Sequence, residues 1–196
     1  MMPENHNFPL PHFLSWMDDA RGSEPSDPDA ACLATVDKNG FPNARVVLVR
    51  RIDDRGFCFF TNCESQKGEE LFHTPKAALN FHWKTLKRQI RVRGTVEPVS
   101  PQEADEYFAT RPAGHKIGAW ASQQSRPLPN RQLLIDRAKA MEEKFGEDVP
   151  RPDYWSGYRL VPFSIEFWQE GEFRLHHRTR YDLNDGGYWT IATLFP

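Results

Sequence analysis

The sequence contains no apolar run long enough to cross a bilayer, and its charges nearly cancel. The formal net charge is -2 over 196 residues, so no general attraction to nucleic acid or to an anionic membrane is expected. Residues 1–21 lack the basic and then apolar layout of a secretory signal peptide. We therefore predict a cytoplasmic protein that binds neither membranes nor nucleic acid, and whose anion sites are local clusters.

Cysteines are few, and the motifs of several large enzyme classes are missing. Cys32, Cys58 and Cys63 have no metal-type spacing, and their odd number favours reduced thiols. The adjacent His176 and His177 would point to opposite faces of a strand, so no metal site is expected. The sequence has no GxGxxG, Walker loop or GxSxG. These absences argue against Rossmann dinucleotide binding, P-loop chemistry and Ser-His-Asp catalysis.

What the chain does contain is a series of short β-branched and aromatic runs separated by turn residues. Hydrophobic content is 39% and charged content 27%, which is ordinary for one globular domain. We expect strands at residues 31–36, 45–50, 56–61, 77–83, 89–96, 158–161, 164–168 and 188–191. Helices are expected at 8–21, 66–73, 101–111 and 130–145. This order lacks the strand–helix alternation of a parallel sheet, so it predicts a mainly β, α+β protein, a barrel decorated by helices.

Three local patterns refine this prediction. Ser100, Pro101 and Glu103 form a capping box that should start the 101–111 helix. Residues 114–118 are punctuated by glycine and are expected to be a loop. The apolar side of the 130–145 helix is expected to face the core.

The stretch from Arg45 to Lys67 is the most informative part of the sequence. It predicts strand, turn, strand and then a helix that Ser65 caps, with Lys67 in its first turn. A helix N-terminus beside a lysine suits a phosphate, so the hairpin suggests a bound anionic cofactor. A solvated hairpin whose arginines cover its ends fits the local pattern equally well.

Other polar groups suggest further contacts to an anion or a ring. Arg174, His176, Arg178 and Arg180 have the alternating spacing of one strand face, which would meet either an anion or the carboxylates of surface ion pairs. Tyr107 and Arg111 lie four apart, with His115 beyond them; this set would hold a second phosphate or form a helix-end charge pair. Three uncharged side chains suit the polar edge of a heterocycle or an ordinary surface: Gln89, Gln124 and Ser125.

Seven motifs occur in series and together carry a family resemblance. They are NARVVLVR, FFTNCESQKGEEL, RQIRVRGTVE, YFATRP, IGAWASQQS, SIEFWQ and RLHHRTRY. The chain resembles the pyridoxine/pyridoxamine 5′-phosphate oxidases. The resemblance implies an FMN-binding split β-barrel, a Greek-key antiparallel barrel flanked by helices, as a single domain over 1–196. It further implies an N-terminal helix or arm in 1–29, barrel-closing and dimer-forming strands in 150–196, and a homodimer with FMN sites at the interface.

The resemblance also implies roles for individual residues. FMN would be contacted by Arg45, Val46, Val47, Leu48, Val49, Phe60, Thr61, Gln66, Lys67 and Gln89, and by the partner subunit's Gln124, Ser125, Trp168 and Arg178. The substrate phosphate would be bound by Arg50, Tyr107, Arg111 and His115. Arg174 and His176 would hold the pyridine ring over the flavin and are the catalytic candidates.

The implied reaction moves a hydride from C4′ of pyridoxine or pyridoxamine 5′-phosphate to flavin N5, giving pyridoxal 5′-phosphate, and O₂ then becomes H₂O₂. The sequence departs from the family pattern at four positions: Arg50 for lysine, Gln66 for arginine, His115 for serine and His177 for aspartate. The N-terminal segment is short, so a substrate-covering arm would be absent or altered. An FMN oxidase of another reduced ring, of the phenazine-pathway type, therefore remains an alternative, as does a flavin- or pyridoxal phosphate-binding protein without turnover.

Overall fold

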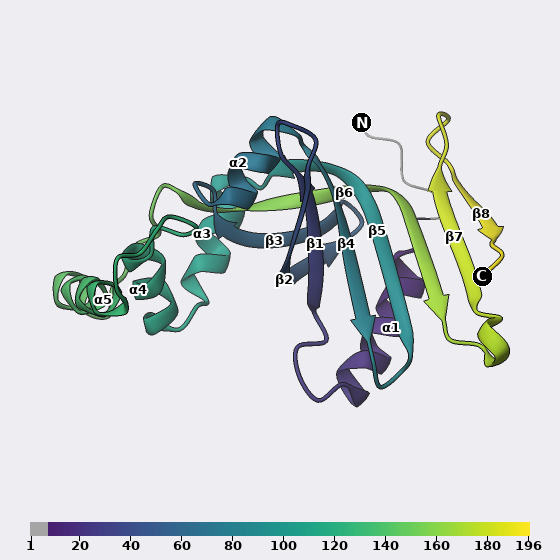
Figure 1. The fold of residues 1–196 in the computed structure, drawn as a ribbon, viewed down its shortest axis with the longest axis horizontal. Coiled ribbons are helices and arrows are strands. Elements are labelled where there is room, and N and C mark those ends of the chain that lie inside the picture. The colour runs from purple at the N-terminus through teal and green to yellow at the C-terminus, as the bar shows by residue number, and fades with distance from the viewer. Residues whose placement is uncertain (1–7) are drawn as a thin grey trace.

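The fold is an antiparallel β-barrel that two further strands extend on one side (Figure 1). The computed structural model describes residues 8–196. Within these residues the barrel strands follow the order β3-β2-β1-β4-β5-β6, and β6 pairs back with β3 to close the barrel. The strands are β1 (Ala30–Val36), β2 (Pro42–Asp53), β3 (Gly56–Asn62), β4 (Lys76–Trp83), β5 (Arg88–Pro98), β6 (Trp155–Gln169), β7 (His177–Leu183) and β8 (Trp189–Thr193). The predicted α+β barrel is confirmed.

Helices cover the barrel and branch away from it. They are α1 (Leu10–Ser23), α2 (Gln66–His73), α3 (Pro101–Ala109), α4 (Ala113–Ala121) and α5 (Arg131–Phe145), and a 3-10 turn, η1 (Glu172–Arg174), precedes β7. Figure 1 shows α1 and α2 against the barrel, and α4 and α5 standing apart at the left. No helix of residues 8–196 is long and apolar enough to span a membrane.

Aromatic side chains fill the space between α1 and the barrel. Phe13 on α1 is fully buried, and its ring centroid lies 5.0 Å from that of Phe57 and 5.2 Å from that of Phe81. These edge-on contacts combine apolar burial with favourable ring geometry. The α1 helix therefore covers the barrel core, and the predicted N-terminal helix is found with shifted ends. Residues 1–7 of the predicted arm lie outside the described residues.

β6 is one long strand where the sequence pattern indicated two. Pro162, which lacks an N–H, sits opposite Gly94 where the β5–β6 register shifts, so the ladder tolerates it. A Cβ on Gly94 would lie 2.1 Å from the Val161 carbonyl oxygen, so a side chain at that position would clash with the partner strand. On one side of this shift β6 pairs with β3 through residues 155–160, and on the other side it pairs with β7 through residues 164–169.

Helices α4 and α5 together form a helical branch, and two expectations about it were wrong. Residues 114–118 belong to α4 and not to a loop. The α5 helix buries none of its residues, and Leu133 remains 41% exposed. The reason is positional: α5 packs against α4, which stands away from the barrel, so its apolar side cannot reach the core. The predicted 101–111 helix also ends early, at Ala109, although its capping box is present.

An ion-pair network around the buried Arg159 fastens α3 to the barrel. Arg159, 2% exposed, donates to Glu103 at 2.6 Å, and Arg55 donates to the same carboxylate at 3.0 Å. Burial alone would raise the pKa of Glu103, but the Ser100 backbone N–H and the charges of Arg159 and Arg55 outweigh it and lower that pKa to about 2. The carboxylate is therefore ionised throughout the neutral range.

Glu103→Gln should reduce the free energy of unfolding by about 3 kcal/mol at pH 7, because it removes one of the two carboxylates, Glu103 and Asp53, that pair with the buried guanidinium of Arg159. The folded pKa lies below the ordinary value of 4.5, so this stabilisation is complete above pH 4.5 and fades as pH falls towards 2. Urea unfolding of both proteins from pH 7 to pH 3 measures the difference. A difference that stays constant with pH would contradict this assignment.

Candidate functional site

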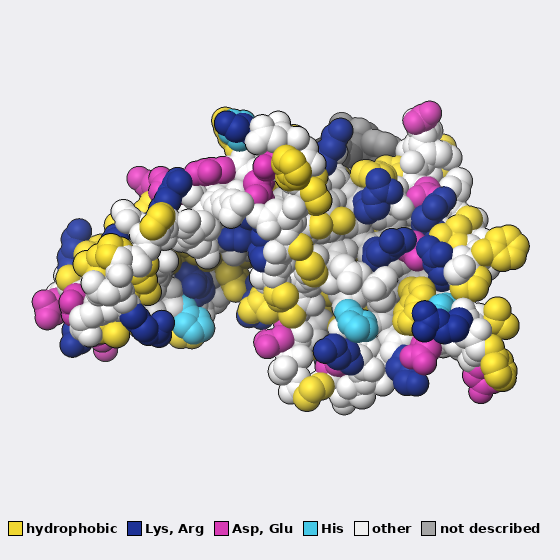
Figure 2. Space-filling view, in the orientation of Figure 1, with side chains coloured by type: hydrophobic (Ala, Val, Ile, Leu, Met, Phe, Trp, Pro, Cys, Tyr) yellow, Lys and Arg dark blue, Asp and Glu magenta, His cyan; other side chains and the backbone are white. Residues whose placement is uncertain are grey.

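A pocket of about 540 Å³ lies between the barrel and the helical branch. Figure 2 shows the branch set apart from the barrel, with basic side chains and a histidine in the recess between them. Strands β2 and β3, helices α2 to α4 and the start of β6 contribute its walls. The lining residues are Val46, Val47, Leu48, Arg50, Phe60, Thr61, Asn62, Lys67, Tyr107, Arg111, Gly114, His115, Gly118, Ala119, Ser122, Gln124 and Trp155.

One end of the pocket is formed by the start of α2. Lys67 Nζ donates to Thr61 Oγ1, Ser65 Oγ and Gln124 Oε1, each at 3.2 Å. Burial, and then the charge of Arg45, lowers the pKa of Lys67. All three acceptors are neutral oxygens, so the ammonium forms no ion pair within residues 8–196. Such a group, beside a helix N-terminus, suits an incoming anion.

Arg45 lies behind this end and does not line the pocket. Its guanidinium donates to Glu70 at 2.9 Å and also bonds Thr35. Glu70 is only 4% exposed, and Asn43 donates to its other oxygen. Arg45 therefore forms an ion pair with Glu70, and its charge helps to lower the pKa of Lys67. Its predicted contact with FMN stays a prediction.

The other end of the pocket is an aromatic floor beside Arg50, Arg111 and His115. The Phe60 and Tyr107 rings stack with centroids 4.1 Å apart, and the Arg111 guanidinium lies 4.8 Å from the centroid of Trp155. Burial lowers the pKa of Arg111. Its Nη1 is buried and has no hydrogen-bond partner in the part of the chain described. A buried donor of this kind calls for an acceptor, and a phosphate oxygen would supply one.

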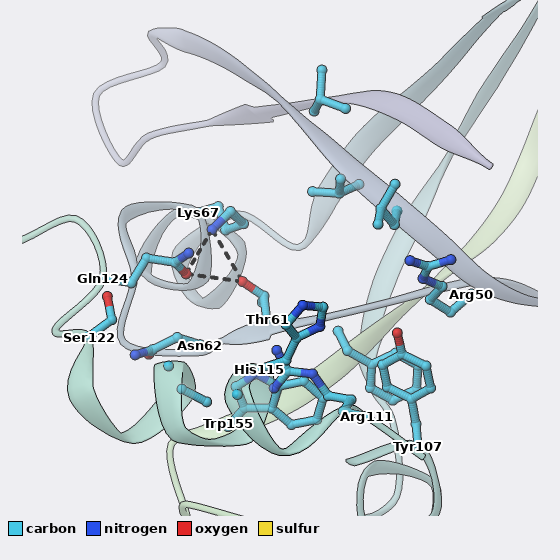
Figure 3. Close-up of a pocket in the computed structure, with 17 residues that line it drawn as sticks. Arg50, Thr61, Asn62, Lys67, Tyr107, Arg111, His115, Ser122, Gln124 and Trp155 are labelled. Carbon is cyan, nitrogen blue, oxygen red and sulfur yellow. Dashed lines mark hydrogen bonds between the residues drawn. The ribbon is translucent and has the colours of Figure 1, made fainter. Parts of the chain in front are cut away.

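Figure 3 shows these two ends in one view. Thr61, Lys67 and Gln124 gather on one side, joined by hydrogen bonds, and Arg50 and Tyr107 lie on the other side. Arg50 donates to Asp29 at 2.6 Å, which partly neutralises it. The structure therefore brings together most of the predicted phosphate-binding residues, in two groups.

The two catalytic candidates lie elsewhere, in a second hollow of about 510 Å³. It is lined by Trp168, Glu170, Gly171, Glu172, Phe173, Arg174 and His176. Arg174 has a φ of 67° in the 3-10 turn, and β7 begins only at His177. The expectation of one strand face carrying Arg174, His176, Arg178 and Arg180 is therefore wrong for the first two. The cause is the turn at η1, which interrupts the β6–β7 hairpin.

Five more predicted residues line neither hollow: Gln66, Ser125, Val49, Gln89 and Arg178. Gln66 is exposed at the first position of α2, Ser125 lies in the turn after α4, and Val49 is buried in the core. Gln89 pairs with Trp168 across β5 and β6, and Arg178 lies on β7. Gln124, which the resemblance attributed to the partner subunit's site, lines the first pocket and accepts a hydrogen bond from Lys67 of its own chain. The turn after α4 returns to α2, which explains this contact.

Sequence reasoning missed several pocket residues: Asn62, Gly114, Gly118, Ala119, Ser122 and Trp155. Gly114 and Gly118 are four apart on α4, and a Cβ on either would meet nothing within 4 Å. Small residues at helical spacing would have indicated a helix face turned towards a ligand. Trp155 carried no such signal, because its role depends on Arg111, which is distant in the sequence. No group of three or more metal-ligating side chains occurs within residues 8–196.

The closed barrel, its two-strand extension and the helical branch define a split β-barrel protein. Residues 17–145 match the family model described as pyridoxamine 5′-phosphate oxidase, and residues 155–196 match the pyridoxine 5′-phosphate oxidase C-terminal dimerisation region. The chain belongs to the pyridoxamine 5′-phosphate oxidase family, as the sequence motifs predicted, and is an oxidase.

Individual relatives agree with this assignment. A pyridoxine/pyridoxamine 5′-phosphate oxidase of Caulobacter vibrioides is 54% identical over 96% of this chain and 85% of its own length. A protein of the same name from Chelativorans sp. is 51% identical over 96% of this chain and 90% of its own. Among solved structures, PhzG from Burkholderia lata, in complex with tetrahydrophenazine-1-carboxylic acid, is 33% identical with a TM-score of 0.91, covering 100% of this chain and 98% of that one.

Proposed function

We propose that the protein is an FMN-dependent oxidase that converts pyridoxine 5′-phosphate, pyridoxamine 5′-phosphate or both to pyridoxal 5′-phosphate, with O₂ as acceptor and H₂O₂ as product. The observation that carries this proposal is the pocket with cationic groups at both ends. Lys67 stands at one end, and Arg111 with Arg50 at the other. Two phosphates, one on the cofactor and one on the substrate, need two such groups.

The residues present fit FMN. Lys67 offers a half-buried ammonium bonded to neutral oxygens, and the start of α2 adds backbone N–H groups. Val46 and Leu48 give the pocket an apolar wall beside this anion site, as a flat ring system requires. Lys67 would hold the cofactor phosphate in place, with Thr61 and Gln124 fixing the direction of its side chain.

The residues at the other end fit a small phosphorylated ring. Arg111 Nη1 and the Tyr107 hydroxyl would bind the substrate phosphate, with His115 and Arg50 beside them. The redox chemistry would be that of bound FMN, which takes two electrons from the substrate and returns them to O₂. This chain's own residues would bind the substrate, orient it against the flavin and exclude water, and none needs to act as a nucleophile.

We further propose that a homodimer completes the site. Arg174 and His176 lie in the second hollow, at the β6–β7 connection and apart from the phosphate-binding pocket. They belong to the region that matches the dimerisation model. In a homodimer, the partner subunit's Arg174 and the partner subunit's His176 would cover the ring bound in this subunit's pocket.

Residues 1–196 are proposed to form a single domain, because β6 is a strand of both the barrel and its extension. A cytoplasmic location is proposed because Cys32, Cys58 and Cys63 are all free thiols.

An oxidase of another reduced ring is the second candidate, favoured by the similarity to PhzG. The unpartnered Nη1 of Arg111 calls for an anionic acceptor on the substrate, which would be a phosphate in the first candidate and a carboxylate in the second. The two candidates therefore differ in whether the substrate must carry a phosphate.

Anaerobic reduction tests the proposal. Purified protein should be yellow, and pyridoxine 5′-phosphate or pyridoxamine 5′-phosphate should bleach the flavin band near-stoichiometrically, whereas unphosphorylated pyridoxine at equal concentration should not. A colourless protein that takes up no FMN, or a flavin that neither phosphate reduces, would refute the proposed activity.

A further inference from the structure

We propose that Glu166 and the main chain at residues 194–195 form a clamp that positions Arg178 for FMN binding. Leu194 and Phe195 follow β8, and Glu166 lies on β6, so the clamp reaches Arg178 on β7 from both neighbouring strands. The inference rests on the proposed function and on the cofactor contact that the family resemblance implies for Arg178 across the homodimer interface. It assigns a positioning role to residues that do not themselves touch the cofactor.

The clamp consists of three hydrogen bonds to one residue. Arg178 Nε donates to Glu166 Oε1 at 2.9 Å, and Arg178 Nη1 donates to the Phe195 carbonyl oxygen at 2.8 Å. The Leu194 N–H donates to the Arg178 carbonyl oxygen at 3.0 Å, which ties the segment to β7 itself. Figure 1 shows the chain after β8 lying beside β7. Two nitrogens of the Arg178 guanidinium are therefore held by hydrogen bonds, and the Arg178 backbone is held by a third.

Glu166 can hold Arg178 in position because its carboxylate is buried and ionised. It is 4% exposed, and its second oxygen pairs with Arg91. Burial alone would raise the pKa of Glu166, but the hydrogen bonds from Arg178 and Arg91 outweigh burial and lower it. The carboxylate stays ionised near neutral pH, so the Arg178 side chain keeps its charged anchor.

The clamp leaves part of the guanidinium available. Arg178 Nη2 makes no hydrogen bond within the described chain, and a quarter of the Arg178 side chain is exposed. A guanidinium presents its donors in a rigid fork, so fixing Nε and Nη1 also fixes the direction of Nη2. Ordering a flexible side chain before the ligand arrives removes that ordering from the free-energy cost of binding. The expected consequence is tighter FMN binding without any added contact.

The test compares two substitutions at one position. Leu194→Pro removes the N–H that bonds Arg178 and displaces the Phe195 carbonyl, whereas Leu194→Ala keeps both main-chain groups. FMN dissociation constants would be measured by quenching of flavin fluorescence on apo-dimer reconstituted from full-length protein. Leu194→Pro should raise the dissociation constant about tenfold, the scale of a lost hydrogen bond to a charged group. Leu194→Ala should stay within about twofold of the parent protein.

A double-mutant cycle separates positioning from general destabilisation. In an Arg178→Ala background, Leu194→Pro should cause no further loss of FMN affinity, because its effect acts through that arginine. Glu166→Gln should behave in the same way and provides a second route if Leu194→Pro does not assemble. Light scattering on each variant confirms that the dimer persists.

Equal FMN affinity in the parent, Leu194→Pro and Glu166→Gln proteins would overturn the clamp, and so would losses that add fully to that of Arg178→Ala. A parent protein that binds no FMN would instead refute the proposed function. The two failures are therefore distinguishable.

Discussion

Arg174→Ala is expected to lower kcat/KM for pyridoxine 5′-phosphate on the order of 100-fold, with FMN still bound. Arg174 lies in the second hollow, away from the Lys67 end of the phosphate-binding pocket, so its removal leaves the cofactor anchor intact. Misplacement of a substrate over a reactive ring has effects of this size. Steady-state H₂O₂ production and the flavin-to-protein absorbance ratio, measured on the same sample, check both parts.

Arg180→Ala is the matched control. Arg180 is also an arginine of the β6–β7 region, but it pairs with Asp182 on its own strand and lines neither hollow. We expect near-parental turnover from it. If Arg174→Ala loses flavin as readily as activity, then Arg174 belongs to the cofactor site and the proposed division of roles is wrong.

Lys67→Met should weaken FMN binding on the order of 100-fold. The substitution keeps the length of the side chain and removes the ammonium that we assign to the cofactor phosphate. Charge-assisted hydrogen bonds have effects of this magnitude, about 3 kcal/mol at the upper end. Titration of apo-protein with FMN measures the change, and riboflavin, which lacks the phosphate, should bind both proteins equally.

Lys84→Met controls for the loss of a positive charge. Lys84 lies exposed in the turn between β4 and β5 and should leave FMN affinity unchanged. An equal loss for FMN and riboflavin in Lys67→Met would show that Lys67 shapes the pocket and does not bind the phosphate.

Much of the fold was predictable because it depends on local sequence patterns. The helix predicted at 66–73 is α2, and the hairpin before it is β2 and β3. Each depends on residues close together in the chain: turn residues at 53–56, and a helix start at Ser65. The cap itself differs in detail, because the Ser65 hydroxyl donates to the Asn62 carbonyl oxygen instead of capping the helix.

The features that escaped prediction depend on contacts between distant segments. Whether the apolar side of α5 faces a core depends on where α4 stands. The partner of Arg45 could not be chosen from sequence, since an anion and Glu70 satisfy a guanidinium equally well. Trp155 entered the site only because β6 begins beneath Arg111. Local periodicity carries no information about such pairings.

The pairing of β3 with β6, which closes the barrel, has a consequence for folding during synthesis. β3 pairs with a strand that follows it by about 100 residues, so its outer edge has no partner until β6 has been synthesised. An open edge rich in aromatic residues is a template for wrong pairing, and such non-local pairing is slow. During that interval we expect Phe57 and Phe59, which the finished barrel buries completely, to be incompletely covered. The nascent chain is therefore most prone to aggregation immediately before β6 emerges, and chaperone contact should be concentrated there.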